Sequence, residues 1–365
     1  MLDRGQAAAG DAVLVVDPSG KALGTAHYSD ASQISLRMLS DHAESIDRAF
    51  FLRRIATAEA HRKRVVSDSN AYRLVHGEGD QLPGLVIDRY ADYFTLQTLD
   101  QGMDRAKAEV VSCLEELFAP RGIMERNDVA VRKREALPLE TGVLAGDVPE
   151  MITVEMNGLK LHADLLHGQK TGIFLDQREN YLAAARYGRG RALDCFTSTG
   201  GFALHLAAKC ESVEAVDSSE TALRVARLNY ELNYQTNPTG QVEFREADVF
   251  EVLAGHASAK RRFDIIVLDP PAFAKARQNL EAAIRGYREI NRRALELLGS
   301  GGILVTCSCS HHLSEAALLE LVAAASLDTG RKLRVLERRM QAQDHPVLLT
   351  VPETLYLKCL ILEVI

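Results

Sequence analysis

ALDCFTSTGGFALHLAAK, residues 192–209, reads as a short apolar strand, a turn of small residues and a helix. The same alternation continues toward the C-terminus, with strands predicted at 212–217, 242–248, 263–269 and 302–309 and helices at 219–233, 281–298 and 314–327. Strands that alternate with helices are typical of a doubly wound parallel sheet. We therefore predict an α/β, Rossmann-like domain with a doubly wound, mostly parallel sheet over residues 166–365.

The residues before 166 follow other patterns. A Pro-Ser-Gly turn predicts a hairpin within a small β-rich segment, residues 1–42. Apolar residues at helical spacing, with cations between them, predict an amphipathic, basic linker helix within 43–69. Residues 70–165 combine short strands, one helix and a second hairpin at 155–165 around Asn-Gly. We expect this last stretch to form an α+β central domain.

The composition indicates an ordinary soluble globular protein. Of the 365 residues, 47% are hydrophobic and 25% are charged. No apolar run approaches the roughly 20 residues that are needed to cross a bilayer. The N-terminal MLDRGQAAAGD lacks a basic region followed by an apolar stretch, so we expect no secretory signal and a cytoplasmic location.

The charge distribution bears on the class of partner. A net charge of −7 argues against a protein whose surface is covered with basic residues for nonspecific nucleic-acid binding. Three basic patches nevertheless occur, at residues 48–64, 131–134 and 331–339. A solvated helix or loop face is the usual explanation of any single patch. Together, on an acidic chain, the three are a modest indication of a polyanionic partner.

Six cysteines are scattered along the chain without repeated Cys-x-x-Cys spacing: Cys113, Cys195, Cys210, Cys307, Cys309 and Cys359. Free thiols are the usual state in a cytosolic chain of this size. Cys307 and Cys309 stand one residue apart in TCSCSHH, residues 306–312, a spacing compatible with half a metal site, a redox pair, a nucleophile or two packing residues. Structural zinc usually takes four ligands in recognisable pairs. Because no second pair occurs, we predict no metal site.

Acidic residues at successive strand ends suggest a cofactor site. In a doubly wound sheet the ligand lies outside the carboxyl ends of the strands. The turn after the first strand, which includes Phe196, Thr197 and Gly200, lacks a phosphate-binding glycine motif, and the preceding Asp194 suits a cationic amino-acid group such as that of S-adenosylmethionine.

Two further carboxylates fit the same cofactor. Asp217, followed by Ser218, ends the second strand, where a carboxylate accepts hydrogen bonds from ribose hydroxyls. Asp248 follows the third strand and is positioned to accept from the adenine amino group. The alternative for each residue is a cap on the following helix. Three such residues at successive strand ends favour ligand binding.

The motif LDPPAFAK, residues 268–275, follows the fourth strand. Its prolines, Pro270 and Pro271, fix the backbone and remove two amide donors, which leaves carbonyl groups able to face a ligand. We predict that Asp269 and Pro270 contact the cofactor and that Pro271, Phe273 and Lys275 contact the substrate. Phe273 suits stacking on a base extruded from RNA. The alternative is a plain Pro-Pro turn.

The motifs TGIFLDQREN (171–180), DCFTSTGGF (194–202), LDPPAFAK, TCSCSHH and DHPVLLTVPETLYLK (344–358) occur in this order along the chain. In these motifs and their order, the chain resembles the large-subunit ribosomal RNA cytosine methyltransferases that carry an N-terminal PUA domain. NAYRLVHGEGDQLPGLVIDRY (70–90) resembles the central domain of that family. The resemblance covers nearly the whole chain and implies a class I methyltransferase fold. Family members usually have further residues before GDAVLVVDPSG, so the PUA-like segment is expected to be N-terminally incomplete.

The resemblance also implies an activity, namely S-adenosylmethionine-dependent methylation of carbon 5 of a cytosine in large-subunit ribosomal RNA. In the family scheme a cysteine thiolate adds to carbon 6 and makes carbon 5 nucleophilic, and a base later removes the proton from carbon 5. Asp269 would hydrogen-bond the cytosine. The FLDQR segment would close over the cofactor through Asp176, Gln177 and Arg178, although a hairpin held by an Asp–Arg pair is an equal alternative for Arg178.

The two neighbouring cysteines differ in how close they lie to the expected ligand crevice. Side chains two residues apart on a strand share a face, and Cys309 lies nearer the carboxyl end of its strand, where the ligand crevice opens. We predict Cys309 as the nucleophile and Cys307 as a packing residue, with Cys307 kept as the second candidate. The proline motif carries no cysteine, so the sequence permits one nucleophile.

Two other functions compete with this one: methylation of a guanine nitrogen, which needs no cysteine, and a noncatalytic RNA-binding or ribosome-assembly role. The expected partner is large-subunit ribosomal RNA. A membrane partner is not expected, and a homodimer is possible.

Overall fold

The computed structural model describes residues 3–168, 171–234, 240–273 and 280–365, and the chain forms two compact units. One unit contains Met1–Leu175 together with Gln343–Thr354. The other contains Asp176–Ala342 together with Leu355–Ile365. Most of DHPVLLTVPETLYLK therefore groups with the N-terminal residues, although its last four residues return to the second unit.

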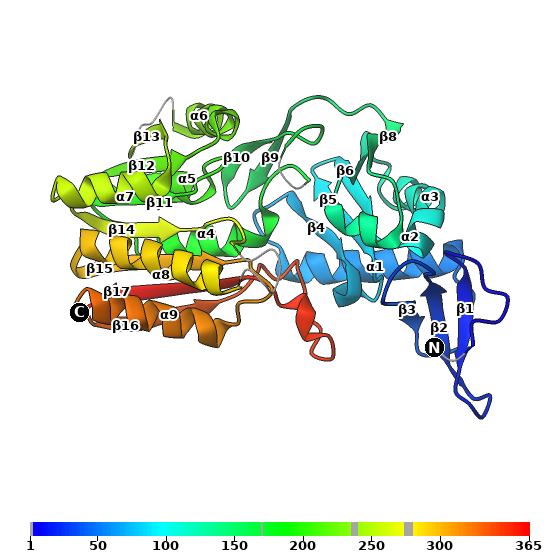
Figure 1. Ribbon diagram of the computed structural model, residues 1–365. Coiled ribbons are helices and arrows are strands. Elements are labelled where there is room, and N and C mark those ends of the chain that lie inside the picture. Colours follow the sequence, from blue (N-terminus) through cyan, green and yellow to red (C-terminus); the bar gives the residue numbers. More distant parts are fainter. Residues whose placement is uncertain (1–2, 169–170, 235–239, 274–279) are drawn as a thin grey trace. The chain divides into compact units, whose positions relative to one another are not determined.

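The second unit is built on a seven-stranded sheet with the strand order β13-β12-β11-β14-β15-β17-β16 (Figure 1). The strands are β11 (Arg191–Cys195), β12 (Ser212–Asp217), β13 (Gln241–Glu246), β14 (Phe263–Leu268), β15 (Leu298–Ser308), β16 (Leu333–Arg339) and β17 (Lys358–Val364). β11 to β15 are mutually parallel, and β17 is antiparallel to its neighbours β15 and β16. The predicted doubly wound, mostly parallel sheet is confirmed. The strand order reverses between β11 and β14, which is where such sheets bind ligands.

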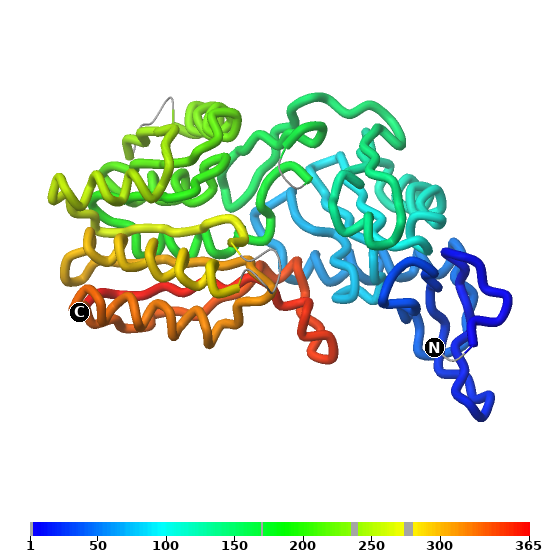
Figure 2. The backbone as a smooth tube through the Cα atoms, viewed as in Figure 1, coloured from blue at the N-terminus to red at the C-terminus, as the bar shows by residue number. Residues whose placement is uncertain are grey.

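Helices cover both faces of this sheet. They are α4 (Arg178–Ala185), α5 (Gly201–Ala207), α6 (Glu220–Tyr234), α7 (Val249–Ser258), α8 (Leu280–Leu297) and α9 (Glu315–Asp328). Successive side chains of β11 point to opposite faces of the sheet. Leu193 packs in the core with α7, α8 and α9, whereas Asp194 on the other face accepts a hydrogen bond from the Ala203 amide in α5. In Figure 2 the last strand, drawn in red, runs back along the sheet beside β15.

The first unit contains three smaller β-structures. β1 (Ala12–Val16), β2 (Ala22–Tyr28) and β3 (Leu36–Ser40) form an antiparallel sheet. A five-stranded sheet contains β4 (Ala71–His76), β5 (Leu85–Tyr90), β6 (Tyr93–Thr98), β7 (Gly122–Asn127) and β8 (Glu140–Gly146), with α2 (Gln101–Arg105) and α3 (Lys107–Phe118) between β6 and β7. β9 (Ile152–Met156) and β10 (Leu159–Ala163) form the expected hairpin, whose turn residues Asn157 and Gly158 both have positive φ.

Helix α1 (Arg48–Val65) occupies part of the predicted basic linker. Its N-cap Asp47 accepts a hydrogen bond from the Phe50 amide, and Phe50, Phe51 and Ile55 are buried in a core shared with β4 and α3. Arg62 is 0% exposed and is paired with Asp80. The prediction that all the cations of this helix lie on one basic face is wrong for Arg62, because the polar side of the helix also packs inward.

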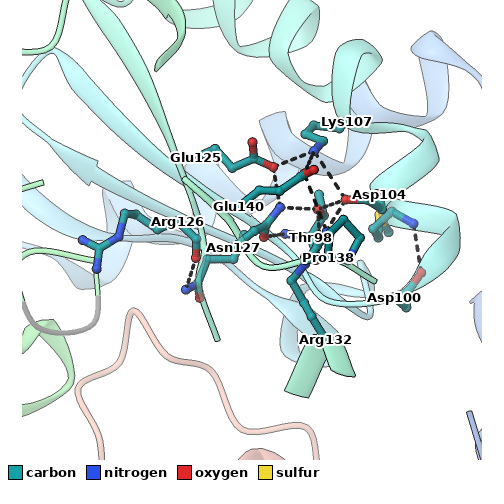
Figure 3. Close-up of polar contacts among 12 residues, drawn as sticks. Thr98, Asp100, Asp104, Lys107, Glu125, Arg126, Asn127, Arg132, Pro138 and Glu140 are labelled. Atoms are coloured by element: carbon teal, nitrogen blue, oxygen red, sulfur yellow. Dashed lines mark hydrogen bonds and ion pairs between the residues drawn. The ribbon is translucent and has the colours of Figure 1, made fainter. Parts of the chain in front are cut away.

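The basic patch at 131–134 is also partly internal. Arg132, in a 3₁₀ turn (Ala130–Glu135), is 0% exposed and donates to the Thr98 and Pro138 carbonyl oxygens and to the Asp104 carboxylate (Figure 3). In the patch at 331–339, Arg334 pairs with Glu363 and Arg338 with Glu315. Local carboxylates thus offset much of this charge, and the patches indicate a polyanionic partner less strongly than the sequence suggests.

Among the described residues, no helix is both long enough and apolar enough to span a membrane.

Candidate functional site

The turn after β11 adopts a rare backbone conformation. Phe196, Ser198 and Gly200 have φ angles of 65°, 50° and 90°, in the left-handed region that favours glycine. The Thr197 amide donates to the Val216 carbonyl at 3.0 Å. The Asn229 side-chain amide, from α6, donates to the carbonyl of Thr199 at 3.0 Å. Strain held in place by fixed contacts is typical of a ligand-binding turn.

Gly201 is needed for helix packing rather than for the shape of the turn. A Cβ atom at this position would lie 2.4 Å from the Tyr181 ring, so Gly201 is required for packing against α4. The glycine pair therefore serves two purposes: Gly200 permits the left-handed turn, and Gly201 makes room for an aromatic ring.

Asp194 is a fully buried carboxylate beneath this turn. Its Oδ2 accepts hydrogen bonds from Thr197 Oγ1 at 2.6 Å and from the Ala203 amide at 2.9 Å. Its Oδ1 has no hydrogen-bond partner among the described residues. Burial raises the pKa of Asp194 to about 7, an effect that the Thr197 hydrogen bond opposes and the nearby Asp269 carboxylate reinforces. A buried carboxylate with a spare oxygen fits a ligand that carries positive charge.

Asp217 connects the turn to the end of β12. Its Oδ2 accepts from the Ser198 amide at 2.8 Å, and its Oδ1 accepts from the Ser219 amide at 2.9 Å. Ser218 is exposed beside it. A carboxylate has about four acceptor positions, so these two bonds leave Asp217 able to accept from ribose hydroxyls.

Asp248 takes the role that the sequence offered as the alternative. It is exposed, and its side chain caps α7 by accepting from the amides of Phe250 and Glu251 at 2.8 and 3.2 Å. The cap explains why an aspartate stands at this position. An adenine contact from the same residue stays a prediction.

The FLDQR segment forms a 3₁₀ turn (Leu175–Gln177) that leads into α4, so the hairpin alternative for Arg178 is wrong. Gln177 Nε2 donates to Asp269 Oδ1 at 2.9 Å, which joins this segment to the end of β14. Asp176 accepts from the Tyr356 hydroxyl at 2.8 Å. The Arg178 side chain is 3% exposed. Its Nη2 lies 3.3 Å from Oε1 of Glu179, so the two adjacent residues form an ion pair.

The proline motif places its residues at different depths. Asp269 extends β14, since its amide donates to the Cys195 carbonyl at 3.4 Å. Pro270 is buried and Pro271 is exposed. The Phe273 ring is half-buried, 4.7 Å from the Tyr287 ring and 6.5 Å from the Phe196 and Phe250 rings, measured between centroids. Lys275, which was also predicted to contact substrate, lies outside the described residues.

The two neighbouring cysteines have different surroundings. Cys307 is 0% exposed and lies opposite Cys359 in the β15–β17 register. Burial raises the pKa of the Cys307 thiol well above its usual range, with Cys359 adding to the shift, so this thiol stays protonated. Cys309 follows the end of β15 and is partly exposed, whereas the other five cysteines are buried. All six are free.

Two side chains that the sequence analysis missed hold the Ser-Cys-Ser segment around Cys309. The Tyr287 hydroxyl of α8 hydrogen-bonds to the Ser308 and Ser310 hydroxyls at 3.0 and 3.1 Å, and both serines are fully buried. The ammonium of Lys358 donates to the Ser310 carbonyl at 2.7 Å. Lys358 ends the DHPVLLTVPETLYLK motif, which was a usable signal. Tyr287 lies in an ordinary amphipathic helix and gives no signal of this role.

In the described part of the chain, no group of three or more His, Cys, Asp or Glu side chains is arranged to hold a metal ion. The geometry instead brings together Asp194, Asp217, Gln177, Asp269 and Cys307 at the carboxyl end of the sheet, and Cys309 follows the end of the strand that contains Cys307.

Comparisons with known proteins agree with this geometry. A family model described as S-adenosylmethionine-dependent methyltransferase matches residues 112–360, and a PUA-like domain model matches residues 2–41. Ribosomal RNA large subunit methyltransferase I of Escherichia coli strain SMS-3-5 is 42% identical over 360 residues, which cover 97% of this chain and 90% of that protein. The protein of the same name from Shigella boydii serotype 18 has the same identity and coverage.

Two solved structures share the fold. SMU.776, assigned as a methyltransferase and complexed with SAH, superposes with a TM-score of 0.84 at 21% identity and covers 98% of this chain and 92% of that one. An assigned SAM-dependent methyltransferase from Streptococcus mutans gives a TM-score of 0.82, with the same identity and coverage.

Proposed function

This chain belongs to the family of S-adenosylmethionine-dependent methyltransferases that contains the ribosomal RNA large subunit methyltransferase I proteins, and we propose that it methylates carbon 5 of a cytosine in large-subunit ribosomal RNA. The relatives support the ribosomal substrate. The base and the carbon are supported by one observation, namely that the single partly exposed cysteine follows the end of β15, the strand that pairs with β14 just before Asp269. A reachable thiol is what the cytosine reaction needs and what methylation of a guanine nitrogen does without.

The residues of the strand-end turns fit the cofactor. When bound, S-adenosylmethionine supplies a methyl group on a positively charged sulfur. We propose that Asp194 Oδ1, which is buried and has no partner among the described residues, receives the cationic amino-acid end. Asp217 would accept hydrogen bonds from the ribose hydroxyls, and Ser218 and Asp248 would lie beside the adenine. The backbone of Phe196, Thr197 and Gly200 would lie along the ligand, and Gln177, Arg178 and Pro270 would close the site from the other side.

The remaining residues would act on the base. Carbon 5 of cytosine is a weak nucleophile, so the Cys309 thiolate would first form a bond from Sγ to carbon 6. The electron pair then available at carbon 5 would form the bond to the methyl group as the bond from that methyl group to the cofactor sulfur breaks, which would leave the sulfur as a neutral thioether. A base takes the proton from carbon 5, the Sγ–C6 bond breaks, and the ring and the thiolate are restored. Asp269, oriented by Gln177, would hydrogen-bond the cytosine, and Pro271 and Phe273 would contact its flipped ring.

Matched cysteine variants test this proposal. Wild-type protein, Cys309→Ala and Cys307→Ala are each incubated with large-subunit ribosomal RNA from a strain that lacks the enzyme, and the methylated nucleosides are identified by mass spectrometry. We expect 5-methylcytidine from the wild type and from Cys307→Ala, and a loss of roughly a thousandfold or more in Cys309→Ala.

Each alternative predicts a different result. Methylguanosine as the product, or methylation that persists in the Cys307→Ala, Cys309→Ala double variant, would contradict the cytosine mechanism. Calorimetry on the wild type checks cofactor binding, since a noncatalytic assembly factor would show none. An enzyme with this substrate would work in the cytoplasm, and the possible homodimer stays a prediction that light scattering of the purified chain can test.

A further inference from the structure

Lys358, the first residue of β17, is a cation in an unusual position. It lies opposite Ser308 in the β15–β17 register and is 6% exposed. Its Nζ donates to the carbonyl oxygens of Ser310 at 2.7 Å and of Tyr356 at 2.9 Å. Lysine is almost never so fully buried without an ionic partner. Among the described residues no carboxylate pairs with Lys358, so its two hydrogen-bond partners are neutral.

The geometry points to Cys309 as the source of the missing negative charge. The Lys358 ammonium binds the carbonyl of Ser310, the residue directly after Cys309, while the Cα of Lys358 faces Ser308, the residue directly before it. Cys309 is the acidic group whose charge acts on Lys358. The Tyr287 hydroxyl holds the serines on either side of Cys309, and the Lys358 ammonium binds the same segment through the Ser310 carbonyl.

We propose that Lys358 is a positioning residue that stabilises Cys309 as a thiolate. The proton of the thiol leaves to solvent, and the thiolate stays beside the ammonium as an ion pair. This inference rests on the proposed function, in which the thiolate attacks carbon 6 of cytosine. Thiolates beside a lysine are favoured because the opposite charge lowers the thiol pKa.

The other titratable groups around the pair do not supply an alternative cation. Burial lowers the pKa of His311, and the charges of Lys358 and His312 lower it further, so His311 is neutral at pH 7. The Tyr287 hydroxyl of α8 has a pKa raised by burial, and it stays protonated. Asp269, which acts on Cys307, is a carboxyl group and cannot supply a positive charge, and Cys307 and Cys359 are buried thiols. Burial lowers the pKa of Lys358 to about 8, and the Cys309 charge opposes that shift.

Alkylation of Cys309 measures this effect without any RNA. Iodoacetamide reacts with thiolates, and five of the six cysteines are buried, so Cys309 should react first in the native protein. The rate at Cys309 is followed by mass spectrometry from pH 5 to pH 10 in the wild type, Lys358→Met, Lys358→Gln and Lys358→Arg. The exposed Lys332→Met is the matched control, which removes a lysine charge elsewhere.

We expect the alkylation midpoint to rise by about one pH unit or more in the Met and Gln variants, as for the loss of a neighbouring opposite charge. Lys358→Arg should restore most of the wild-type midpoint, and Lys332→Met should leave it unchanged. Gln keeps hydrogen-bond donors for the buried carbonyls, so it remains informative where Met weakens folding, which circular dichroism detects. An unchanged midpoint in a folded Met or Gln variant would overturn the inference.

The two proposals fail in different ways. If the midpoints shift as expected but no 5-methylcytidine forms, the ion pair stands and the proposed function is wrong. If 5-methylcytidine forms but the midpoints do not move, the proposed function stands and Lys358 has only a structural role. Where both hold, the acidic limb of the methylation pH profile should move upward in Lys358→Gln in parallel with the alkylation midpoint.

Discussion

Asp194 shows at the scale of a single residue how this chain gives up folding stability for a site. A carboxylate at full burial loses its hydration, and the two donors at Oδ2 compensate for only part of that loss. Its pKa of about 7 records the remaining cost, because the buried site prefers the neutral acid. Residues that are costly to the folded state are commonly retained where a ligand later offsets the cost. A cationic ligand at Oδ1 would do so here.

The sign of the Asp194 pKa shift leads to a prediction about stability. Its folded pKa lies above the unfolded value of 3.8, so between about pH 4 and pH 7 the folded protein holds a proton that the unfolded chain has lost. This residue therefore makes the protein less stable as pH rises through that window. Asp194→Asn, which is neutral at every pH, should gain stability relative to the wild type as pH rises, and this gain should be on the order of 2 kcal/mol larger at pH 8 than at pH 5.

Thermal unfolding without cofactor, followed by circular dichroism at pH 5, 6, 7 and 8, measures the difference. Asp248→Asn is the matched control, because Asn caps a helix as well as Asp and the side chain is exposed. A difference between Asp194→Asn and the wild type that does not change with pH would show that the burial penalty is absent. The same variant should bind S-adenosylmethionine at least about tenfold more weakly, since it loses the charged acceptor.

At the scale of elements, β15 and its continuation illustrate what periodicity can and cannot predict. Its apolar run and its place in the β/α alternation predict a buried strand, and the two-residue period puts Cys307 and Cys309 on one face. The contacts that hold Cys309 come from elsewhere. Tyr287 belongs to α8, and Lys358 belongs to a strand that runs antiparallel to β15. Tyr287 leaves no local signal of this contact, and although Lys358 ends a recognisable motif, its pairing with β15 through an antiparallel strand could not be predicted from the sequence.

The same limit explains the basic patches. VRKR reads as four successive surface residues, yet the 3₁₀ turn points Arg132 inward and leaves Lys133 and Arg134 outside. Lys107 lies in the same group of charges, with Asp104, Glu125 and Glu140 around its ammonium (Figure 3). Charge counted along a sequence therefore overstates the charge that reaches solvent.

Removing Arg132 should destabilise the first unit. Arg132→Ala leaves the Thr98 and Pro138 carbonyl oxygens without this donor and the Asp104 carboxylate without its buried partner, so we expect a loss of about 3 kcal/mol. Arg134→Ala, in the same turn but exposed, should change stability by less than about 0.5 kcal/mol. Urea unfolding of both variants tests this pair. Equal effects would mean that the buried network does not stabilise the unit.

At the scale of the whole molecule, the pattern of strands and helices in the second unit follows the sequence closely. β12 spans Ser212–Asp217, as the hydrophobic run indicates. Which unit each segment belongs to is harder to predict from the sequence. Residues 343–354 follow the last helix and strand of the second unit in sequence, yet they group with the N-terminal unit, because contacts between residues distant in sequence determine where a segment packs.

The central claim is that Cys309 attacks a cytosine, and trapping of the intact enzyme on RNA tests it most directly. In RNA that contains 5-fluorocytosine, the fluorine replaces the proton that must leave carbon 5, so the Sγ–C6 bond cannot break and a denaturant-resistant complex accumulates. After digestion, mass spectrometry identifies the modified peptide. The account predicts a methylated 5-fluorocytosine attached to Cys309 in the wild type and in Cys307→Ala. A complex attached at Cys307, or the absence of any complex from an enzyme that still methylates its RNA, would contradict it.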